Sequence, residues 1–404
     1  MTVKELIAKF EYAANNPNAL LDGYLKEGKK VIGCFPVYTP KEIVHASGMI
    51  PMGTWGGNTA IERAKEYFPA FCCSIIQAIM EYGLKGSFKG LSGAIIPCHC
   101  DTLITLTQNW KSGVKEIPMI GFAFPQNRKI QAGKDYLVSE YNTVKTKLEE
   151  ICGHEITDES IQASIEVYNE HRKAMKEFVE LVPDYLNTIT PRVRNYVLKS
   201  AHFMKVEEHT ALVKELVAGL KAMPKEDFKG KKIITSGIIL DDKGLLEVFE
   251  ANNMAIVADD IAQETRQFRT LIPEGGSALE RMAQWWADVE GCSLAYDPAK
   301  LRGKMVVEDA KKLGADGVVY ALMKFCDPEE YDYPIFKKDM EGAGVPHLFI
   351  EIEQGTTSIE QIRTRIQTSM ILFRPSFFTI GFCFNFSNFS PSLKVLHTHL
   401  AFSI

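Results

Sequence analysis

The sequence predicts an α/β protein with two parallel-sheet layers. Two stretches of the chain, 30–130 and 232–352, each contain short apolar segments that alternate with helix-like ones. A helical pattern separates the two stretches. With 404 residues, of which 46% are apolar and 24% charged, the chain can bury the large cores that two layers require.

The first stretch gives six alternating strand and helix segments, and the second gives a further series with helices between most of its members. The first series is Val31 to Phe35, Pro40 to Ser47, Ile50 to Thr54, Phe71 to Tyr82, Ala94 to Pro97 and Met119 to Phe124. The second is Lys232 to Ile239, Leu245 to Glu250, Ala255 to Val257, Gly317 to Phe325 and His347 to Ile352. Neither series contains G-x-G-x-x-G or G-x-x-x-x-G-K-[ST], so the sequence does not support a dinucleotide or P-loop nucleotide site.

Residues Thr157 to Pro224 carry the helical pattern. Ile161, Ile165 and Tyr168 are spaced i, i+4 and i+7, which places them on one helix face. Thr190-Pro191 puts a capping residue before a proline at the first helical position. We expect this segment to brace the two α/β layers.

Composition narrows the class of protein. The formal net charge of −5 is spread along the chain, which argues against nucleic acid and a polybasic membrane face as partners. The first residues form an amphipathic helix pattern without a signal-peptide core, so we expect a cytoplasmic protein with reduced thiols. Nine cysteines at irregular spacing fit a disulfide framework poorly, which leaves metal binding, catalysis or packing.

The last residues, Ser369 to Ile404, differ from the rest of the chain. They hold eight of the 23 phenylalanines and no Asp or Glu, and polar residues and prolines interrupt them too often for a membrane-spanning helix. We interpret 369–404 as an extension foreign to the domain, such as the product of a frameshift or a cloning junction, and as an aggregation liability.

Two apolar strands end at a cysteine that precedes an aspartate. Val318 to Phe325 leads into Cys326-Asp327-Pro328-Glu329-Glu330, where Asp327, Pro328 and Glu330 fit the N-cap, N1 and N3 positions of a helix. Gly93 to Pro97 similarly leads to Cys100-Asp101. Ligands of open α/β sheets bind beyond the carboxyl ends of strands, where helix N-termini favour anions such as thiolates. We therefore expect Cys326 and Cys100 to share a site.

A third ligand is expected near the start of the helix after Phe71, where either Cys72 or Cys73 fits. The remaining cysteines have no comparable context; they are Cys34, Cys98, Cys152, Cys292 and, in the final segment, Cys383. Paired C-x₂-C knuckles of structural zinc are absent, and three thiolates from distant loops suit an iron–sulfur cluster with one non-protein ligand. His99, between Cys98 and Cys100, leaves a zinc site as an alternative, although a single histidine more often has a structural role.

Several longer motifs carry a family resemblance. They are Ile32-Gly33-Cys34-Phe35-Pro36-Val37-Tyr38, Tyr67-Phe68-Pro69-Ala70-Phe71, Cys100-Asp101-Thr102-Leu103, Gln108-Asn109-Trp110-Lys111, Ala258-Asp259-Asp260-Ile261-Ala262-Gln263-Glu264-Thr265-Arg266 and Met323-Lys324-Phe325-Cys326-Asp327-Pro328-Glu329-Glu330-Tyr331. From Lys4 to Thr368 the chain resembles beta subunits of 2-hydroxyacyl-CoA dehydratases, relatives of benzoyl-CoA reductase subunits. One departure is Phe124, which stands where that family usually has histidine.

The resemblance implies two flavodoxin-like, Rossmann-like domains and a cluster between them. The expected division is an N-terminal α/β domain at 1–150, a helical segment at 151–228 and a C-terminal α/β domain at 229–368. The resemblance also implies a 4Fe-4S cluster held by Cys73, Cys100 and Cys326 with one non-protein ligand, and it favours Cys73 over Cys72.

The same resemblance implies the chemistry and the partners. Elimination of water from a 2-hydroxyacyl thioester must remove an unactivated beta proton, which acid–base catalysis supports poorly. A single electron delivered to the thioester carbonyl gives a ketyl radical anion that expels the hydroxyl, and the beta hydrogen then becomes acidic. We expect an alpha subunit to bind the acyl-CoA and a separate ATP-dependent iron–sulfur activator to deliver the electron. No catalytic residue is assigned to this chain.

Other polar groups have two interpretations. Asp259, Asp260, Glu264, Arg266 and Arg269 could orient a partner or the cluster, but we favour a capped helix with surface ion pairs. Residues 108–111 either face the partner or end a helix. Tyr38, Glu42, His45 and the segment 55–57 follow the first two strands, where we expect them to shape the cluster pocket rather than to bind substrate.

Overall fold

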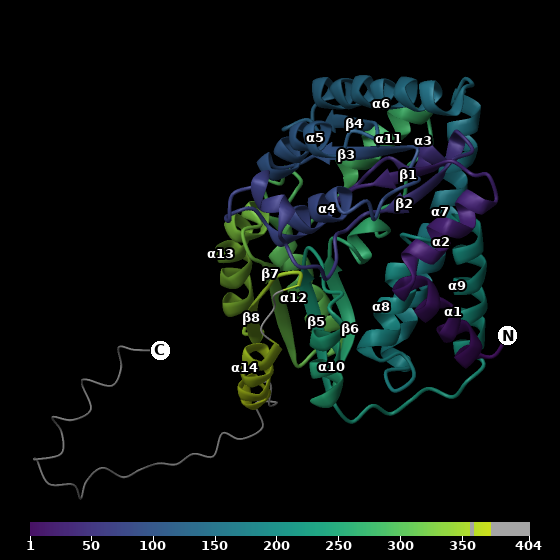
Figure 1. Ribbon diagram of the computed structural model, residues 1–404. Coiled ribbons are helices and arrows are strands. Elements are labelled where there is room, and N and C mark those ends of the chain that lie inside the picture. The colour runs from purple at the N-terminus through teal and green to yellow at the C-terminus, as the bar shows by residue number, and fades with distance from the viewer. Residues whose placement is uncertain (356–358, 373–404) are drawn as a thin grey trace, which may run out of the picture. The chain divides into compact units, whose positions relative to one another are not determined.

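The computed structural model describes residues 1–355 and 359–372, and it contains two four-stranded, all-parallel sheets. The first sheet has the order β2-β1-β3-β4, from β1 (Val31–Cys34), β2 (Ile50–Gly53), β3 (Gly93–Cys98) and β4 (Met119–Ala123) (Figure 1). The second has the order β6-β5-β7-β8, from β5 (Lys231–Gly237), β6 (Met254–Ile261), β7 (Gly317–Met323) and β8 (His347–Ile352). The predicted α/β class with two parallel layers is confirmed.

Helices cover both sheets, as parallel connections require. Two helices, α1 (Val3–Asn15) and α2 (Pro17–Lys26), precede the first sheet. Its own helices are α3 (Lys41–Ala46), α4 (Ser74–Leu84), α5 (Asp101–Gly113) and α6 (Gln131–Cys152). Those of the second sheet are α10 (Lys243–Ala251), α12 (Leu301–Leu313), α13 (Asp327–Gly342) and α14 (Ile359–Leu372). The helix α11 (Ala278–Asp288) lies between β6 and β7 in the sequence but packs on α6 of the first layer. Short 3-10 turns lie at η1 (Arg63–Glu66), η2 (Val182–Asp184) and η3 (Thr265–Gln267).

One member of the second apolar series was placed wrongly among strands. Leu245 to Glu250 forms most of α10, because Asp242 caps this helix by accepting a hydrogen bond from the Leu245 N–H at 2.9 Å. The buried residues Leu245, Leu246 and Phe249 then lie on one helix face, a spacing that a short apolar run does not distinguish from a strand.

The helical segment consists of α7 (Asp158–Leu181), α8 (Pro191–Ser200) and α9 (Val206–Lys221). The Thr190 side chain accepts from the Val193 N–H, and Pro191 begins α8, as the sequence predicts. Ile161, Ile165 and Tyr168 are buried on α7. Because α7 packs against α3 and α8 packs against α10, the segment joins elements of the two layers.

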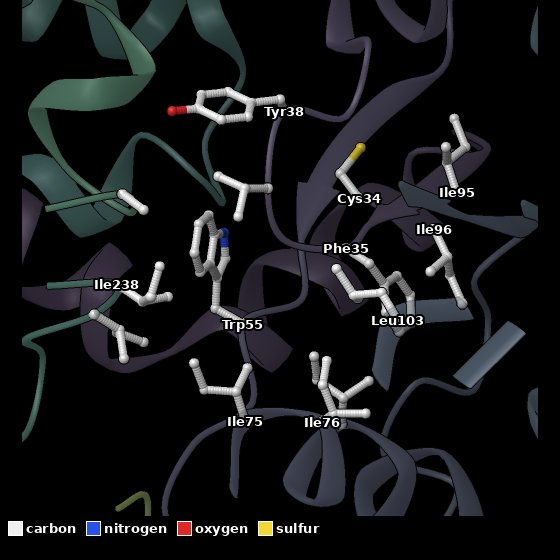
Figure 2. Close-up of a cluster of buried hydrophobic side chains, with 14 of the residues drawn as sticks. Cys34, Phe35, Tyr38, Trp55, Ile75, Ile76, Ile95, Ile96, Leu103 and Ile238 are labelled. Carbon is white, nitrogen blue, oxygen red and sulfur yellow. The ribbon is translucent and has the colours of Figure 1, made fainter. Parts of the chain in front are cut away.

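The larger apolar core includes side chains from both layers. Trp55 follows β2, Ile75 lies in α4 and Ile238 follows β5, and all three belong to this core. Figure 2 shows Trp55 in this cluster with Ile75 and Ile238. Every residue of β7 is buried, which is typical of a parallel strand covered on both faces.

Within the described residues, no helix is both long and apolar enough to cross a bilayer. The predicted foreign extension, 369–404, lies outside the described residues from 373 onward, and its first four residues complete α14. The predicted domain boundaries stay predictions.

Candidate metal centre

Three cysteines occupy the N-cap positions of three helices. Cys73 precedes α4, Cys100 precedes α5 and Cys326 precedes α13, each as the residue just before the first helical turn. The sequence prediction that Asp327 caps its helix was therefore wrong by one position. Asp327 is the first residue of α13, where a carboxylate still interacts favourably with the helix dipole without occupying the cap.

Equivalent strands of the two sheets carry two of these cysteines. β3 and β7 are each third in their sheet's strand order, and Cys100 and Cys326 follow them within three residues. The carboxyl ends of the two sheets meet at the start of α4. The Ser74 hydroxyl donates to Met323 Sδ at the end of β7 (3.1 Å) and accepts from the backbone N–H of Gln354 after β8 (2.8 Å). Cys73 is therefore held directly against the second sheet.

The three thiols interact with one another. Burial raises the pKa of Cys73 to about 12, and the neighbouring Cys100 raises it further, while the backbone N–H of Ile76 opposes the shift. The pKa of Cys326 is raised well above its usual value, first by burial and then by Cys73, with a smaller contribution from Cys100. Burial also raises the pKa of Cys100, although hydrogen bonds from the backbone N–H groups of Leu103 and Thr102 lower it. The three sulfurs are therefore near neighbours, with Cys73 buried and with Cys100 and Cys326 partly exposed.

The donor set fits an iron–sulfur cluster. Three soft sulfur donors converge, and the N–H groups of three helix N-termini point toward them, an arrangement that stabilises an anionic centre. Among the described residues, no group of three or more His, Cys, Asp and Glu is placed to hold a metal ion. A single ion needs its ligands around one centre, whereas a cubane distributes its protein ligands over separate iron atoms.

Neighbouring cysteines are close but differently placed. Cys72 lies beside the site, because it contacts residues that follow Cys100 and Cys326. Burial raises the pKa of Cys72, a hydrogen bond with the Thr102 side chain lowers it, and the Asp327 carboxylate raises it. The Cys98 thiol bonds instead to the Ile96 carbonyl at 3.8 Å, two residues back in β3. The geometry thus leaves Cys72 as a neighbour of the set, and only Cys73 of this pair caps a helix.

His99 is directed away from the thiols. Its Nε2 donates to the Val37 carbonyl (3.1 Å), and its ring stacks on Phe124 with centroids 3.8 Å apart. Burial lowers the pKa of His99 to about 3, so the ring is neutral. These contacts agree with the structural role that the sequence favoured, and they give Phe124 a packing function.

The residue before Cys326 has a constrained backbone. Phe325 has a φ of 62°, a conformation that bulky residues rarely adopt. Its N–H donates to Glu330 Oε1 at 2.9 Å, so the first turn of α13 holds the turn that presents Cys326. Such strained positions cluster at functional sites.

The charged residues at the end of β6 and just after it form a buried network, so the favoured interpretation of surface ion pairs was wrong. Asp260 binds Arg266 (2.8 Å), Arg302 (2.6 Å) and Arg269 (3.0 Å). Three guanidinium groups hold the pKa of Asp260 well below its usual range, against the opposing effect of burial. Nearby, Arg194 pairs with both Asp259 and Glu264. Contacts between residues far apart in the sequence bury these side chains, and a single sequence does not reveal such contacts.

The sequence analysis missed the residues that extend this network to α13. Glu329, in the first turn of α13, binds Arg302 (2.8 Å), Arg266 (3.3 Å), Ser293 (2.6 Å) and the Tyr320 hydroxyl (2.6 Å). Burial favours the neutral acid, but Arg302 and Arg266 lower the pKa of Glu329. An ionised network therefore fixes the helix that Cys326 caps.

Two residues expected to shape the cluster pocket bind the helical segment instead. Glu42 pairs with the buried Arg172 of α7. His45 contacts Ser164 Oγ (2.9 Å) and Glu207 Oε1 (2.8 Å). Both lie in α3, which packs on α7, and this packing turns their side chains away from the thiols.

The other expected residues make internal contacts with neighbouring elements. The Tyr38 hydroxyl donates to Cys292 Sγ at 3.1 Å. Gln354 bonds to the Trp55 carbonyl (2.9 Å) and to the Gly57 N–H (2.9 Å), which links residues 55–57 to the start of α4. In the segment 108–111, Asn109 donates to the Tyr67 carbonyl (2.7 Å) and Trp110 is fully buried, so both have internal packing roles.

Comparisons with known proteins agree with this architecture. A family model described as 2-hydroxyglutaryl-CoA dehydratase, D-component, matches residues 36–369. The chain is 48% identical over 359 residues to the (R)-phenyllactyl-CoA dehydratase beta subunit of Clostridium sporogenes, a match covering 89% of this chain and 96% of the relative. It is 44% identical to the lactoyl-CoA dehydratase subunit beta of Anaerotignum propionicum, covering 91% and 98%. A benzoyl-CoA reductase subunit of Thauera aromatica is 26% identical, again covering 91% and 98%. The chain belongs to the 2-hydroxyglutaryl-CoA dehydratase, D-component, family.

Proposed function

We propose that this chain is the beta subunit of a 2-hydroxyacyl-CoA dehydratase and that Cys73, Cys100 and Cys326 hold a 4Fe-4S cluster with one non-protein ligand. The observation that carries this proposal is the convergence of three helix-capping thiols at the carboxyl ends of two parallel sheets. The reaction class comes from relatives at 44–48% identity that are named dehydratase beta subunits.

The chain's own residues bind and orient the cofactor. Cys73, Cys100 and Cys326 supply thiolates, and backbone N–H groups of the first helical turns donate to the sulfurs. The Glu329 network fixes α13, and Ser74 ties α4 to the second sheet. When bound, such a cluster supplies single electrons for radical elimination of water. The apolar core covers Cys73, whereas Cys100 and Cys326 are partly exposed.

A partner surface surrounds the cysteines. Large apolar side chains are exposed near each of them: Phe71 (70% exposed) precedes Cys73, Ile104 (47%) lies in the first turns of α5, and Tyr331 (82%) lies in the first turns of α13. Exposed aromatic and aliphatic side chains of this kind anchor protein interfaces. We assign this surface to an alpha subunit that binds the acyl-CoA. A separate ATP-dependent iron–sulfur protein would deliver the electron, and all eight cysteines of the described part are free, which suits a reducing cytoplasm.

Cysteine substitution with matched neighbours tests the ligand assignment. The chain is purified anaerobically with its alpha subunit, and iron, acid-labile sulfide and cluster spectra are measured. Cys73→Ser, Cys100→Ser and Cys326→Ser should each lose most of the beta-chain cluster, whereas Cys72→Ser and Cys98→Ser should retain it. Loss of iron in the Cys72 variant with retention in the Cys73 variant would contradict the assignment.

An acyl-CoA reductase function is the alternative. Its support is the 26% identity to the benzoyl-CoA reductase subunit, against 48% for a dehydratase beta subunit. The reconstituted complex is assayed with 2-hydroxyacyl-CoA and with aromatic acyl-CoA. Formation of 2-enoyl-CoA from the hydroxyacyl thioester supports the dehydratase, and reduction of the aromatic thioester without any water elimination refutes it.

A further inference from the structure

A cavity of 150 Å³ lies among the first layer, the helical segment and the second layer, apart from the cysteine site. Most of its wall is apolar; the apolar side chains are Leu21, Met52, Trp55, Phe88, Leu91 and Phe203. An apolar cavity of about 150 Å³ accommodates a molecule the size of benzene. Trp55, which Figure 2 shows inside the shared core, forms one side of it.

Two buried polar side chains of the wall have no hydrogen-bond partner. Gln263 is 2% exposed, and neither its Oε1 nor its Nε2 is bonded within the described structure. Thr54 is 5% exposed, and its Oγ1 is likewise unbonded. The Gln263 backbone is firmly held, because its N–H donates to Ile238 O (2.9 Å) and its carbonyl accepts from His202 Nε2 (2.8 Å). Buried polar groups of native proteins are nearly always paired, so these three atoms indicate a missing partner.

The charge of the wall indicates a neutral partner. Its two charged residues, Lys199 and Asp241, pair with each other at 2.7 Å and leave no net charge. Gln263 also borders a second cavity of 60 Å³, which is too small for more than a few water molecules. Of these two cavities, the larger one therefore offers room for an organic molecule beside the Gln263 amide.

We propose that the 150 Å³ cavity binds a small neutral molecule with a planar group that donates and accepts side by side: a primary amide or a protonated carboxylic acid on a short apolar body. The Gln263 amide has the complementary donor and acceptor, so two parallel hydrogen bonds form. The Thr54 hydroxyl supplies a third. Because the ligand contacts all three segments of the wall, its binding favours the folded chain by mass action. This site does not depend on the proposed cluster.

Thermal unfolding with isobutyramide, isobutyrate and benzene tests the proposal in the complex with the alpha subunit. Saturating isobutyramide should raise Tm by about 2 °C or more, and isobutyrate should do so increasingly as pH falls toward its acid form. A crystal soaked with isobutyramide should show it bonded to Gln263. The proposal is overturned if benzene stabilises as well as isobutyramide does, if neither stabilises, or if ordered water alone occupies the cavity in the soaked crystal.

Gln263→Leu separates the polar recognition from the cavity itself. This variant removes both unpaired amide atoms at nearly constant volume, so its own Tm without ligand should rise slightly, and its response to isobutyramide should disappear while any response to benzene remains. Gln267→Leu is the matched control, because the Gln267 amide is already bonded to the Ala262 carbonyl at 2.7 Å. Thr54→Val is a second variant, and it should lose part of the Tm response to isobutyramide. An isobutyramide response that persists in Gln263→Leu refutes the site.

Discussion

The β3–α5 junction (98–101) and the β7–α13 junction (324–327) occupy equivalent places in the two sheets, yet different forces hold them. The first is packed by aromatic rings: His99 stacks on Phe124, and Trp286 lies 5.2 Å from His99 and 4.6 Å from Phe124 between ring centroids. The second is fixed by ions, because Glu329 binds Arg266 and Arg302. The same topology thus presents a cysteine by two physical means.

The difference matters because the two kinds of support fail differently. Aromatic packing is a sum of many short contacts, so a truncation costs an amount set by the lost volume and surface. A buried ionic network depends on every member, since removing one leaves the others charged and unpaired in a poorly solvated place. We therefore expect the β7–α13 junction to be the more vulnerable to a single substitution.

Arg302→Met should have the largest effect on stability. Arg302 binds Asp260, Glu329 and Asp332, and all three carboxylates are buried. Its loss leaves an excess of buried negative charge and should lower the free energy of unfolding by about 3–5 kcal/mol. Urea unfolding followed by circular dichroism measures the change. Arg192→Met, which removes a half-exposed arginine paired with Glu247 and Glu250, is the control and should cost far less. Equal losses of stability in the two variants would show that the buried ion pairs of Arg302 contribute no more than the exposed ion pairs of Arg192.

Trp286→Leu should cost about 2–4 kcal/mol, somewhat less than the loss of Arg302. Trp286 is 1% exposed and packs on Tyr38, His99 and Phe124. Because the lost contacts are apolar, the cost should be the same in solutions of low and high NaCl concentration. Tyr136→Leu, at an exposed position of α6, serves as the control. A strong salt dependence of the Trp286 effect would contradict the proposed contrast between the junctions.

Sequence patterns were sufficient for the sheets because parallel strands buried on both faces read as apolar runs. Sequence patterns failed for residues whose structure depends on contacts with distant parts of the chain. Leu245 to Glu250 is apolar in either a strand or a helix, and only the Asp242 cap distinguishes them. Asp259 and Asp260 have the composition of a surface turn, yet contact with Arg194, Arg266 and Arg302 buries them.

The candidate site was partly predictable for a related reason. A cysteine between a buried strand and a helix start is visible in the sequence, and Cys100 and Cys326 were found in this way. Cys73 follows a longer connection, so its residues alone left Cys72 equally suitable. Glu329 and Arg302 carried no local signal, because their pairing joins two helices, α12 and α13, that are brought together only in the fold.

Glu264→Gln should stabilise the chain at alkaline pH, by on the order of 2 kcal/mol. Burial raises the pKa of Glu264 to about 7; the neighbouring Asp259 carboxylate adds to this rise and Arg194 opposes it. The folded pKa lies above the unfolded value of 4.5, so this group's contribution to stability is fully present below pH 4.5 and is lost as pH rises through 7. Urea titrations of both proteins on the acid and alkaline sides of that window measure the difference. A variant that is more destabilised on the alkaline side than on the acid side would reverse this sign and show that Glu264 is needed as an anion.

Lys214→Met should have the smallest effect, less than about 0.5 kcal/mol. Lys214 of α9 pairs with Glu170 of α7, and about half of each side chain is exposed. Water and salt screen this pair, and holding two long side chains together costs entropy, so any contribution should vanish at about 1 M NaCl. Glu170→Gln should behave identically, and the double variant should show no coupling beyond experimental error. A coupling energy near that of the Arg302 network would mean that burial does not govern the strength of ion pairs here, and the contrast between the two junctions would then need another explanation.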